Sequence, residues 1–260
     1  MERMVLEIRN ISKRFGGISA LTDVSFQIEE GEIFGLIGPN GAGKTTMFNV
    51  ITNMYAPSEG SVLFSGKPIT GMKPHKITDM GICRTFQNIK LFQQMTVLEN
   101  VMVGGHTRSS AGVFRSVFRL PSQKKEETNL KTKAENLLEL VGLASHSSMM
   151  AENISYGQQR RLEIARALAS DPKLLLLDEP AAGMNEKETD SLYDLIKEVQ
   201  KRGITVLIIE HDMPLVMKLC DRITVLNFGK KLAEGTPDQI QNNESVIEAY
   251  LGTEEEEALA

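Results

Sequence analysis

The stretch Gly38-Pro39-Asn40-Gly41-Ala42-Gly43-Lys44-Thr45-Thr46 is the most informative part of this sequence. It follows an apolar run at residues 32–37 that is typical of a buried strand, and it precedes a helix-like segment at 45–52. Glycines let such a loop turn its N–H groups toward phosphate oxygens, and the helix that begins there adds positive potential. Lys44 supplies a point charge for the β- and γ-phosphates, and the Thr45 hydroxyl can ligate Mg²⁺. Strand, loop and helix together predict a nucleotide phosphate site.

A second informative run is Leu174-Leu175-Leu176-Leu177-Asp178-Glu179, an apolar strand that ends in two carboxylates. In a parallel sheet, ligands bind beyond the carboxyl ends of the strands, so we expect both acids to emerge near the phosphates. Asp178 is suited to hold Mg²⁺, directly or through water. Glu179 is suited to orient or deprotonate an attacking water.

Composition excludes several classes of protein. The chain has 260 residues with 29 Lys and Arg against 34 Asp and Glu, a net charge of −5 that argues against binding nucleic acid by charge. The longest aliphatic run, residues 174–177, is far shorter than the ~20 apolar residues of a membrane helix. Two cysteines, Cys83 and Cys220, are too few for a disulfide framework, so we expect reduced thiols in a cytosolic protein.

The order of strand and helix patterns predicts the fold class. The first quarter reads as strands, residues 88–168 show mostly helical periodicity, and strands alternate with helices from residue 174 onward. Such alternation predicts an α/β core with a mostly parallel sheet covered on both faces and a helical insertion near the middle. Within that insertion, residues 104–127 are basic and loop-like.

The segment Asn153-Ile154-Ser155-Tyr156-Gly157-Gln158-Gln159 precedes an Arg-rich helical pattern. Ser155 is expected to cap that helix, and Gly157 permits a close backbone approach. The segment resembles the signature of the ATP-binding subunits of ABC transporters, Leu-Ser-Gly-Gly-Gln followed by an Arg-rich helix. This chain departs from that pattern at Ile154 and at Tyr156, which replaces the first glycine.

Other positions match the same family one by one. Gln87, in Arg84-Thr85-Phe86-Gln87, resembles the glutamine that touches Mg²⁺ and the nucleophilic water. His211, after a predicted strand end, resembles the switch histidine that contacts the γ-phosphate. Phe15 resembles the aromatic residue that stacks on adenine. Gly183, Met184 and Asn185 lie where the family has its inter-subunit loop, with Asn185 where many members have Asp.

The resemblance implies a P-loop nucleotide hydrolase of the ABC ATPase type, a mostly parallel sheet core with an N-terminal antiparallel β part and a helical insertion. It divides the chain into a β part with the phosphate loop at 1–87, a helical signature subdomain at 88–168, the rest of the nucleotide core at 169–252 and an acidic tail at 253–260. Catalytic roles fall to Glu179, His211 and Gln87. The implied ATP-binding residues are Phe15, Gly38, Pro39, Asn40, Gly41, Ala42, Gly43, Lys44, Thr45 and Thr46.

The resemblance also implies cofactors and partners. ATP and Mg²⁺ are the implied cofactors. The implied metal-binding residues are Thr45, Gln87 and Asp178. Two ATPase subunits, identical or different, would meet head to tail, so that Ser155, Tyr156, Gly157 and Gln158 reach the ATP held by the other subunit. Membrane permeases and, indirectly, a substrate-binding protein would complete the assembly at the cytoplasmic face of the membrane.

In detail the chain resembles the ATPases of branched-chain amino acid importers. The signature version, the run Glu179-Pro180-Ala181-Ala182-Gly183-Met184-Asn185 and the ending Ala249-Tyr250-Leu251-Gly252 carry this likeness. Uptake of branched-chain or related amino acids is therefore the expected function. The alternatives are the ATPase of a lipid or lipopolysaccharide exporter and a soluble ABC-type ATPase acting on DNA or ribosomes. A kinase or GTPase would leave the signature unexplained, and the guanine-reading Asn-Lys-x-Asp is absent.

Overall fold

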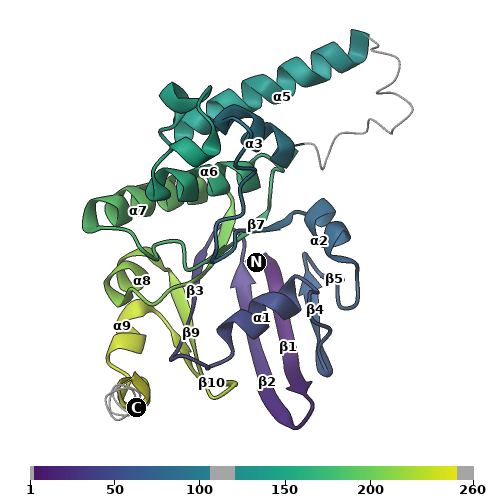
Figure 1. The fold of residues 1–260 in the computed structure, drawn as a ribbon. Helices are drawn as coiled ribbons and strands as arrows, with labels where there is room; N and C mark the ends of the chain where they lie inside the picture. The colour runs from purple at the N-terminus through teal and green to yellow at the C-terminus, as the bar shows by residue number, and fades with distance from the viewer. Residues whose placement is uncertain (1–2, 106–120, 251–260) are drawn as a thin grey trace.

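The computed structural model describes residues 3–105 and 121–250 (Figure 1). Its centre is a six-stranded sheet in the order β10-β9-β3-β8-β7-β6. The last five strands in this order run parallel to one another, and β10 pairs antiparallel with β9 at one edge. The strands are β3 (Ile33–Ile37), β6 (Ile82–Arg84), β7 (Leu174–Asp178), β8 (Thr205–Ile209), β9 (Arg222–Asn227) and β10 (Lys230–Gly235).

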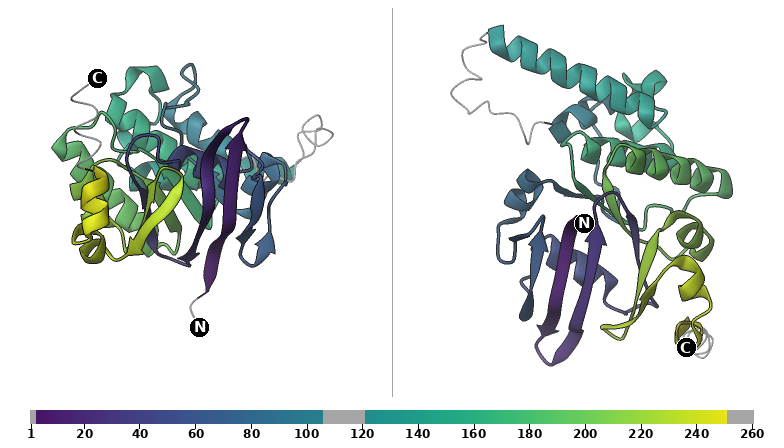
Figure 2. Two further views of the ribbon diagram at one scale, coloured as in Figure 1. Left: turned by 90° about the horizontal axis from the view of Figure 1, so that it is seen from below. Right: turned by 180° about the vertical axis from the view of Figure 1, so that it is seen from behind.

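A second, antiparallel sheet is formed by the N-terminal part of the chain. Its order is β2-β1-β4-β5, and every pair of neighbouring strands in it is antiparallel. The two sheets face each other across a shared core, as the two views of Figure 2 show. The strands are β1 (Met4–Phe15), β2 (Ile18–Glu29), β4 (Glu59–Phe64) and β5 (Lys67–Pro68).

The helices fall into groups by position. Helices α3, α5 and α6 pack against one another at the end of the molecule farthest from the turn between β1 and β2 (Figure 1). No helix within residues 3–105 and 121–250 is long and apolar enough to cross a membrane. The helices are α1 (Lys44–Ile51), α2 (Pro74–Met80), α3 (Val97–Gly105), α5 (Pro121–Leu140), α6 (Tyr156–Leu168), α7 (Glu186–Lys201), α8 (Met213–Leu219) and α9 (Pro237–Gln241), with short 3-10 turns η2 (Ala144–His146) and η3 (Ala151–Asn153).

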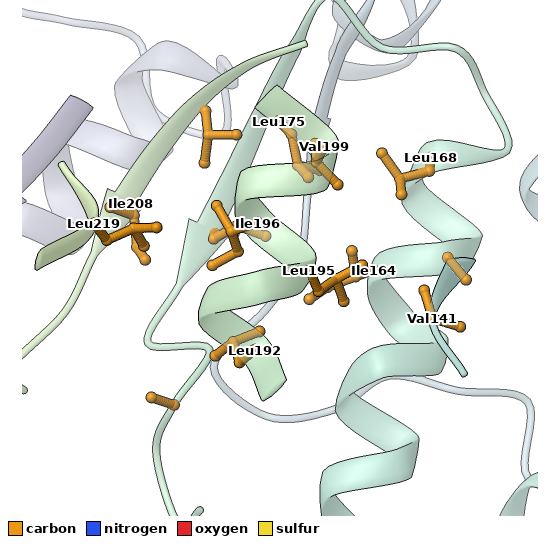
Figure 3. Close-up of a cluster of buried hydrophobic side chains, with 14 of the residues drawn as sticks. Val141, Ile164, Leu168, Leu175, Leu192, Leu195, Ile196, Val199, Ile208 and Leu219 are labelled. Atoms are coloured by element: carbon orange, nitrogen blue, oxygen red, sulfur yellow. The ribbon is translucent and has the colours of Figure 1, made fainter. Parts of the chain in front are cut away.

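Alternate residues of the six-stranded sheet enter two separate cores, because successive side chains of a strand point to opposite faces. In β3, Ile33 and Ile37 pack toward the helices α6, α7 and α8, whereas Phe34 and Leu36 pack toward α1 and the antiparallel sheet. Figure 3 shows part of the first core, where Leu192 and Ile196 of α7 lie over the strands. Burial on both faces explains why β3, β7 and β8 are continuous apolar runs.

The structure confirms the predicted fold class and corrects one segment. Of the segment 104–127, expected to be loop-like, residues 104–105 end α3 and residues 121–127 belong to α5, which begins at Pro121 and continues into the periodic stretch that was predicted to be helical. Proline is favoured in the first turn of a helix, where its missing N–H has no acceptor to lose. Most of the expected basic segment and the acidic tail lie outside the described residues. The division into subdomains stays a prediction.

Glu32 lies directly before β3 at the amino end of the parallel sheet, and only 9% of its surface is exposed. The Nη1 atom of Arg222 lies 3.4 Å from its Oε2, while its Oε1 has no hydrogen-bond partner among the described residues. Burial raises the pKa of Glu32 from 4.5 to about 7, because desolvation of the carboxylate outweighs the attraction of Arg222.

This raised pKa predicts how stability depends on pH. Between pH 4.5 and about 7 the folded protein holds a proton on Glu32 that the unfolded chain has released, so stability falls as the pH rises through this window. Glu32→Gln removes this titration, and we expect it to reduce the decline in stability by about 3 kcal/mol. Thermal melting of both proteins across the window measures the difference. Parallel melting curves would show that Glu32 does not titrate there.

Candidate active site

The phosphate loop connects β3 to α1 and lines a pocket of about 220 Å³. At the start of α1, the Nζ of Lys44 donates to the carbonyl oxygens of Gly38 and Pro39 at 2.6 and 2.9 Å. Gly38 has φ 147°, and a Cβ there would come within 2.1 Å of the carbonyl oxygen of Leu226 on β9. The pocket is lined by Ala20, Asn40, Gly41, Ala42, Gly43, Lys44, Thr45, Thr46, Glu179 and His211.

Burial and two nearby acids have opposite effects on the pKa of Lys44. Only 6% of the residue is exposed, and desolvation lowers the pKa of its ammonium group. The carboxylates of Glu179 and Asp178 act in the opposite direction and favour the charged form. The loop therefore places the Lys44 ammonium group in the lining of the pocket, close to the two acids at the end of β7.

Glu179 joins two loops that are far apart in the sequence. Its Oε2 accepts a hydrogen bond from Nε2 of Gln87 at 2.7 Å, and its Oε1 lies 2.7 Å from Nε2 of His211. Its backbone N–H donates to the carbonyl oxygen of Ile209 at the end of β8, at 2.9 Å. The structure thus brings together all three residues that the sequence predicted as catalytic, and two of them line the pocket.

The backbone of Glu179 is itself unusual. Its φ of 47° lies in the left-handed region, which costs a residue other than glycine on the order of 1 kcal/mol. The turn continues with hydrogen bonds from the N–H of Ala182 to the carbonyl of Glu179 and from Met184 to Ala181, at 3.2 and 3.0 Å. Such backbone strain persists only where surrounding contacts hold it, and it is concentrated at functional sites.

Asp178 is the last residue of β7 and is 3% exposed. Its Oδ2 accepts from Nη2 of Arg84 at 2.7 Å, and Arg84 in turn donates from Nη1 to the side chain of Asn49 on α1 at 2.7 Å. Arg84 was quoted in the sequence only as part of the glutamine motif. Its place at the end of β6, the strand next to β7, is what brings it to Asp178.

The predicted signature residues begin α6. The Ser155 side chain accepts from the N–H of Gln158 at 3.4 Å, and the Gln158 side chain accepts from the N–H of Ser155 at 2.9 Å. This capping box confirms the expected helix start. A Cβ on Gly157 would lie 2.6 Å from Oε1 of Glu188, so the close approach expected at this glycine is toward α7 of the same chain.

The expected inter-subunit loop packs beside the signature. Asn185 caps α7 through a reciprocal pair of hydrogen bonds with Glu188, the residue that Gly157 approaches. Gly183 has φ 76°, and a Cβ there would touch the ring of Tyr156 at 3.4 Å. Two contacts, one through Glu188 and one through Tyr156, therefore join this loop to the start of α6.

Neither of these two segments lines the phosphate pocket of its own chain, as far as the described residues show. Phe15 is also outside the pocket lining. It ends β1, is 42% exposed, and packs edge to face on Tyr55 with ring centroids 5.1 Å apart. The structure therefore gathers the phosphate loop, the acids, Gln87 and His211, and leaves the signature and Phe15 at separate places.

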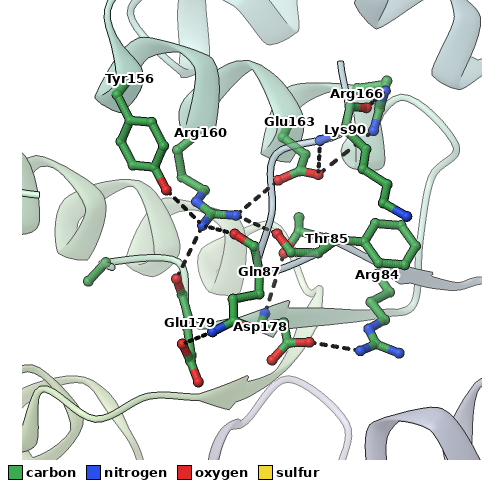
Figure 4. Close-up of polar contacts among 12 residues, drawn as sticks. Arg84, Thr85, Gln87, Lys90, Tyr156, Arg160, Glu163, Arg166, Asp178 and Glu179 are labelled. Atoms are coloured by element: carbon green, nitrogen blue, oxygen red, sulfur yellow. Dashed lines mark hydrogen bonds and ion pairs between the residues drawn. The ribbon is translucent and has the colours of Figure 1, made fainter. Parts of the chain in front are cut away.

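Arg160 on α6 joins these places, and the sequence did not single it out (Figure 4). Its side chain is fully buried. Nη1 donates to the carbonyl oxygen of Phe86 at 2.6 Å, and Nη2 donates to that of Gln87 at 2.7 Å. Nη2 also lies 3.4 Å from the carbonyl oxygen of Glu179 and 3.5 Å from Oη of Tyr156. One guanidinium thus contacts, from α6, the backbone of the two loops that carry Gln87 and Glu179.

Glu163, one turn further along α6, is the counter-charge of Arg160. Its Oε2 lies 3.1 Å from Nη1 of Arg160, and its side chain is 1% exposed. Burial raises the pKa of Glu163, while Arg160 and Arg166 oppose the rise. The sequence signals this pair only by placing two charged residues on the helix face that its apolar residues predict to be buried. A solvated ion pair on an exposed helix face would have the same spacing, so the sequence alone could not identify it.

These features define a class of protein, the nucleotide-binding cassette. The phosphate loop lies beside a strand that ends in two acids, and a glutamine and a histidine both contact the carboxylate of the second acid. A family model described as "ABC transporter" matches residues 21–182, and one described as "Branched-chain amino acid ATP-binding cassette transporter" matches residues 230–256. The chain therefore belongs to the ABC transporter family, as an ATP-binding cassette that hydrolyses ATP.

Individual relatives cover nearly the whole chain. It is 46% identical to the high-affinity branched-chain amino acid transport ATP-binding protein LivG of Escherichia coli, over 97% of this chain and 99% of that protein. A solved ATP-binding cassette of an ABC transporter in its ADP conformation superposes with a TM-score of 0.84 at 36% identity, covering 96% and 99% of the two chains. A dimeric cassette bound to ADP and Pi has a TM-score of 0.75 at 27% identity, covering 89% and 98%.

The Arg160 contacts predict a separable effect on stability and on catalysis. Arg160→Met leaves the buried Glu163 without its nearest counter-charge and with only Arg166, 3.9 Å away, so we expect it to lower the free energy of unfolding by about 3 kcal/mol. It also releases the carbonyl groups of Phe86 and Gln87, so kcat for ATP should fall about tenfold or more. Denaturant unfolding and steady-state hydrolysis measure the two effects.

The double variant Arg160→Met, Glu163→Met is the matched control. Replacing both charges by apolar side chains of similar volume removes the buried carboxylate that had lost its nearest counter-charge, so most of the stability should return. The rate should stay low, because neither methionine can donate to the loop carbonyls. Full recovery of kcat in the double variant would show that Arg160 acts on the fold alone.

Proposed function

We propose that this chain is the ATP-hydrolysing subunit of an importer for branched-chain or related amino acids. The observation that supports hydrolysis best is the Glu179 carboxylate, held by Gln87 and His211 at the mouth of the phosphate pocket. The cargo class rests on the 46% identity to LivG and on the matching model of residues 230–256. That C-terminal match favours the importer over the exporter and over a soluble ATPase.

In the proposed reaction, ATP places its phosphates on the loop from Gly38 to Thr46, where the backbone N–H groups and Lys44 bind them. Glu179 orients the attacking water and accepts its proton. Gln87 and His211, which share the two oxygens of that carboxylate, fix its direction. When ATP enters, we expect His211 to turn toward the γ-phosphate, since its side chain is 44% exposed at the pocket.

Mg²⁺ is the cofactor that the oxygen-rich edge of the sheet fits. No group of three or more His, Cys, Asp or Glu side chains in the described part of the chain could hold a metal by itself. Mg²⁺ in nucleotide sites takes one or two protein oxygens and completes its shell with phosphate oxygens and water. The Thr45 hydroxyl, the Gln87 amide oxygen and the Asp178 carboxylate are such oxygens. Bound there, the metal would neutralise charge developing on the phosphates.

A second ATPase subunit would complete the site. Ser155 and Tyr156 are exposed at the start of α6, Gln158 is half-buried and Gly157 is buried, and none of the four lines the pocket of its own chain. A helix start with free N–H groups favours anions, so it suits the γ-phosphate of ATP held by a partner cassette. Gly183, Met184 and Asn185, which pack beside the signature, would meet the partner as well. Phe15 would stack on adenine.

Permease subunits are the proposed membrane partners, and the chain would act at the cytoplasmic face. A largely apolar pocket of about 390 Å³ lies between α2, β6, α3 and α6, where Phe86 and Phe92 form part of the lining. Phe86 directly precedes Gln87, so a permease segment bound in this pocket would contact the loop that carries Gln87. A substrate-binding protein would act indirectly through the permeases.

Uptake in cells tests this proposal. A strain that lacks this gene should lose binding-protein-dependent uptake of radiolabelled leucine, and the wild-type gene should restore it. Lys44→Ala removes the cation from the phosphate loop, so it should restore less than a tenth of the uptake rate while the protein is made at a normal level. Normal leucine uptake in the deletion strain would contradict the importer. Accumulation of lipid or lipopolysaccharide precursors instead would favour the exporter.

A further inference from the structure

Glu210 is a buried acid whose role neither the family resemblance nor the proposed reaction uses. It follows β8 directly and is 3% exposed. Its Oε1 accepts the N–H of Ala181 at 2.6 Å, and its Oε2 accepts the N–H of His211 at 3.0 Å. Both oxygens of the carboxylate therefore bind backbone groups, and the two groups belong to different loops.

Those two loops carry the pair that faces the nucleotide. Ala181 lies two residues after Glu179, and His211 is the residue that contacts Glu179 through Nε2 at 2.7 Å. These contacts form a closed ring. The Glu179 side chain contacts the His211 side chain, the His211 N–H donates to Glu210, and Glu210 also accepts from the N–H of Ala181, which the chain joins back to Glu179. The bond from the N–H of Glu179 to the carbonyl of Ile209 closes the same two loops from the strand side.

We propose that Glu210 is a positioning residue for ATP hydrolysis, which sets His211 and Glu179 against each other by fixing the backbone of both loops. This inference rests on the proposed roles of His211 and Glu179. Glu210 itself is not among the described residues that line the phosphate pocket. Its effect passes through the two residues that do.

The chemistry of the ring requires a carboxylate. An ionised carboxylate offers two acceptor oxygens and no donor, which suits two N–H groups that approach from opposite sides. An amide offers only one acceptor and would turn an NH₂ group toward the other N–H. Burial raises the pKa of Glu210, while the N–H groups of Ala181, His211 and Asp212 and the charge of His211 oppose the rise. Hydrogen bonds from backbone N–H groups favour the ionised form of an acid and so act against its burial.

The same acid also reaches the predicted inter-subunit loop. Ala181 begins the turn in which the N–H of Met184 donates to the carbonyl of Ala181 at 3.0 Å, and Gly183 and Asn185 continue from it. A shift of this turn would therefore pull on Glu210 and, through it, on His211. Enzymes lose about 100-fold in rate when a catalytic group is misplaced by about 1 Å, so a firm link here matters for rate.

Glu210→Gln tests the proposal in the full chain. We expect kcat for ATP to fall at least tenfold while KM changes less than twofold, because the phosphate contacts of Lys44 and the loop remain. Glu32→Gln is the matched control: it makes the same change in another buried acid, at the amino end of the sheet, and should keep wild-type kcat. A melting temperature of Glu210→Gln within a few degrees of that of the wild type would exclude a general loss of fold. Wild-type kcat in Glu210→Gln would overturn the inference.

A double-variant cycle with His211→Ala separates positioning from a general structural role. If Glu210 acts by holding His211 against Glu179, that pair is already lost in His211→Ala, and adding Glu210→Gln should lower the single-turnover rate less than threefold further. A full tenfold further loss would overturn the inference. Wild-type activity of His211→Ala would instead refute the proposed role of His211, and this inference with it. If Glu210→Gln does not fold, Glu210→Asp, which keeps the charge but cannot span both N–H groups, takes its place in the cycle.

Discussion

The carboxylate of Glu179 is the point on which the rest of the structure depends. Its two oxygens are shared between Gln87 and His211, each at 2.7 Å, and its backbone is held with φ 47° at the end of an entirely buried strand. A side chain in that position has few alternative directions. The strained turn is maintained by the backbone bond to Ile209 and by the contacts of Arg160 and Glu210 on neighbouring loops. Many of the polar contacts near the pocket therefore fix the position and direction of the Glu179 side chain.

The parallel sheet makes this convergence possible. β3, β6, β7 and β8 all end at the same edge, and each delivers one part of the site: the phosphate loop, the Gln87 loop, the acid pair and His211. The helical part then adds a link from outside the sheet, because Arg160 of α6 holds the carbonyls of Phe86 and Gln87. A movement of α6 relative to the sheet would therefore shift the backbone at Gln87 first. This supplies a physical route by which a partner bound to the helical part could influence hydrolysis.

The sequence predicted the fold and the phosphate site because both depend on local patterns. The apolar runs at β3, β7 and β8, the glycine loop and the acids after β7 are visible without any tertiary contact. Arg84, Arg160 and Glu210 could not be predicted in the same way. Each acts through a partner 29 to 94 residues away, and nothing in the local sequence separates a buried charged residue from a solvated one. The start of α5 at Pro121 was missed because its first turns are polar and lack an apolar period.

The rate of ATP cleavage by Glu179→Gln tests this account most directly. Glutamine keeps the size of the side chain and can still contact Gln87 and His211, but it cannot accept a proton from water. In a single-turnover measurement with bound radiolabelled ATP, we predict a rate lower by about 100-fold or more, with ATP affinity close to that of the wild type. Cleavage at the wild-type rate would show that Glu179 is not the base and that the surrounding contacts serve another purpose.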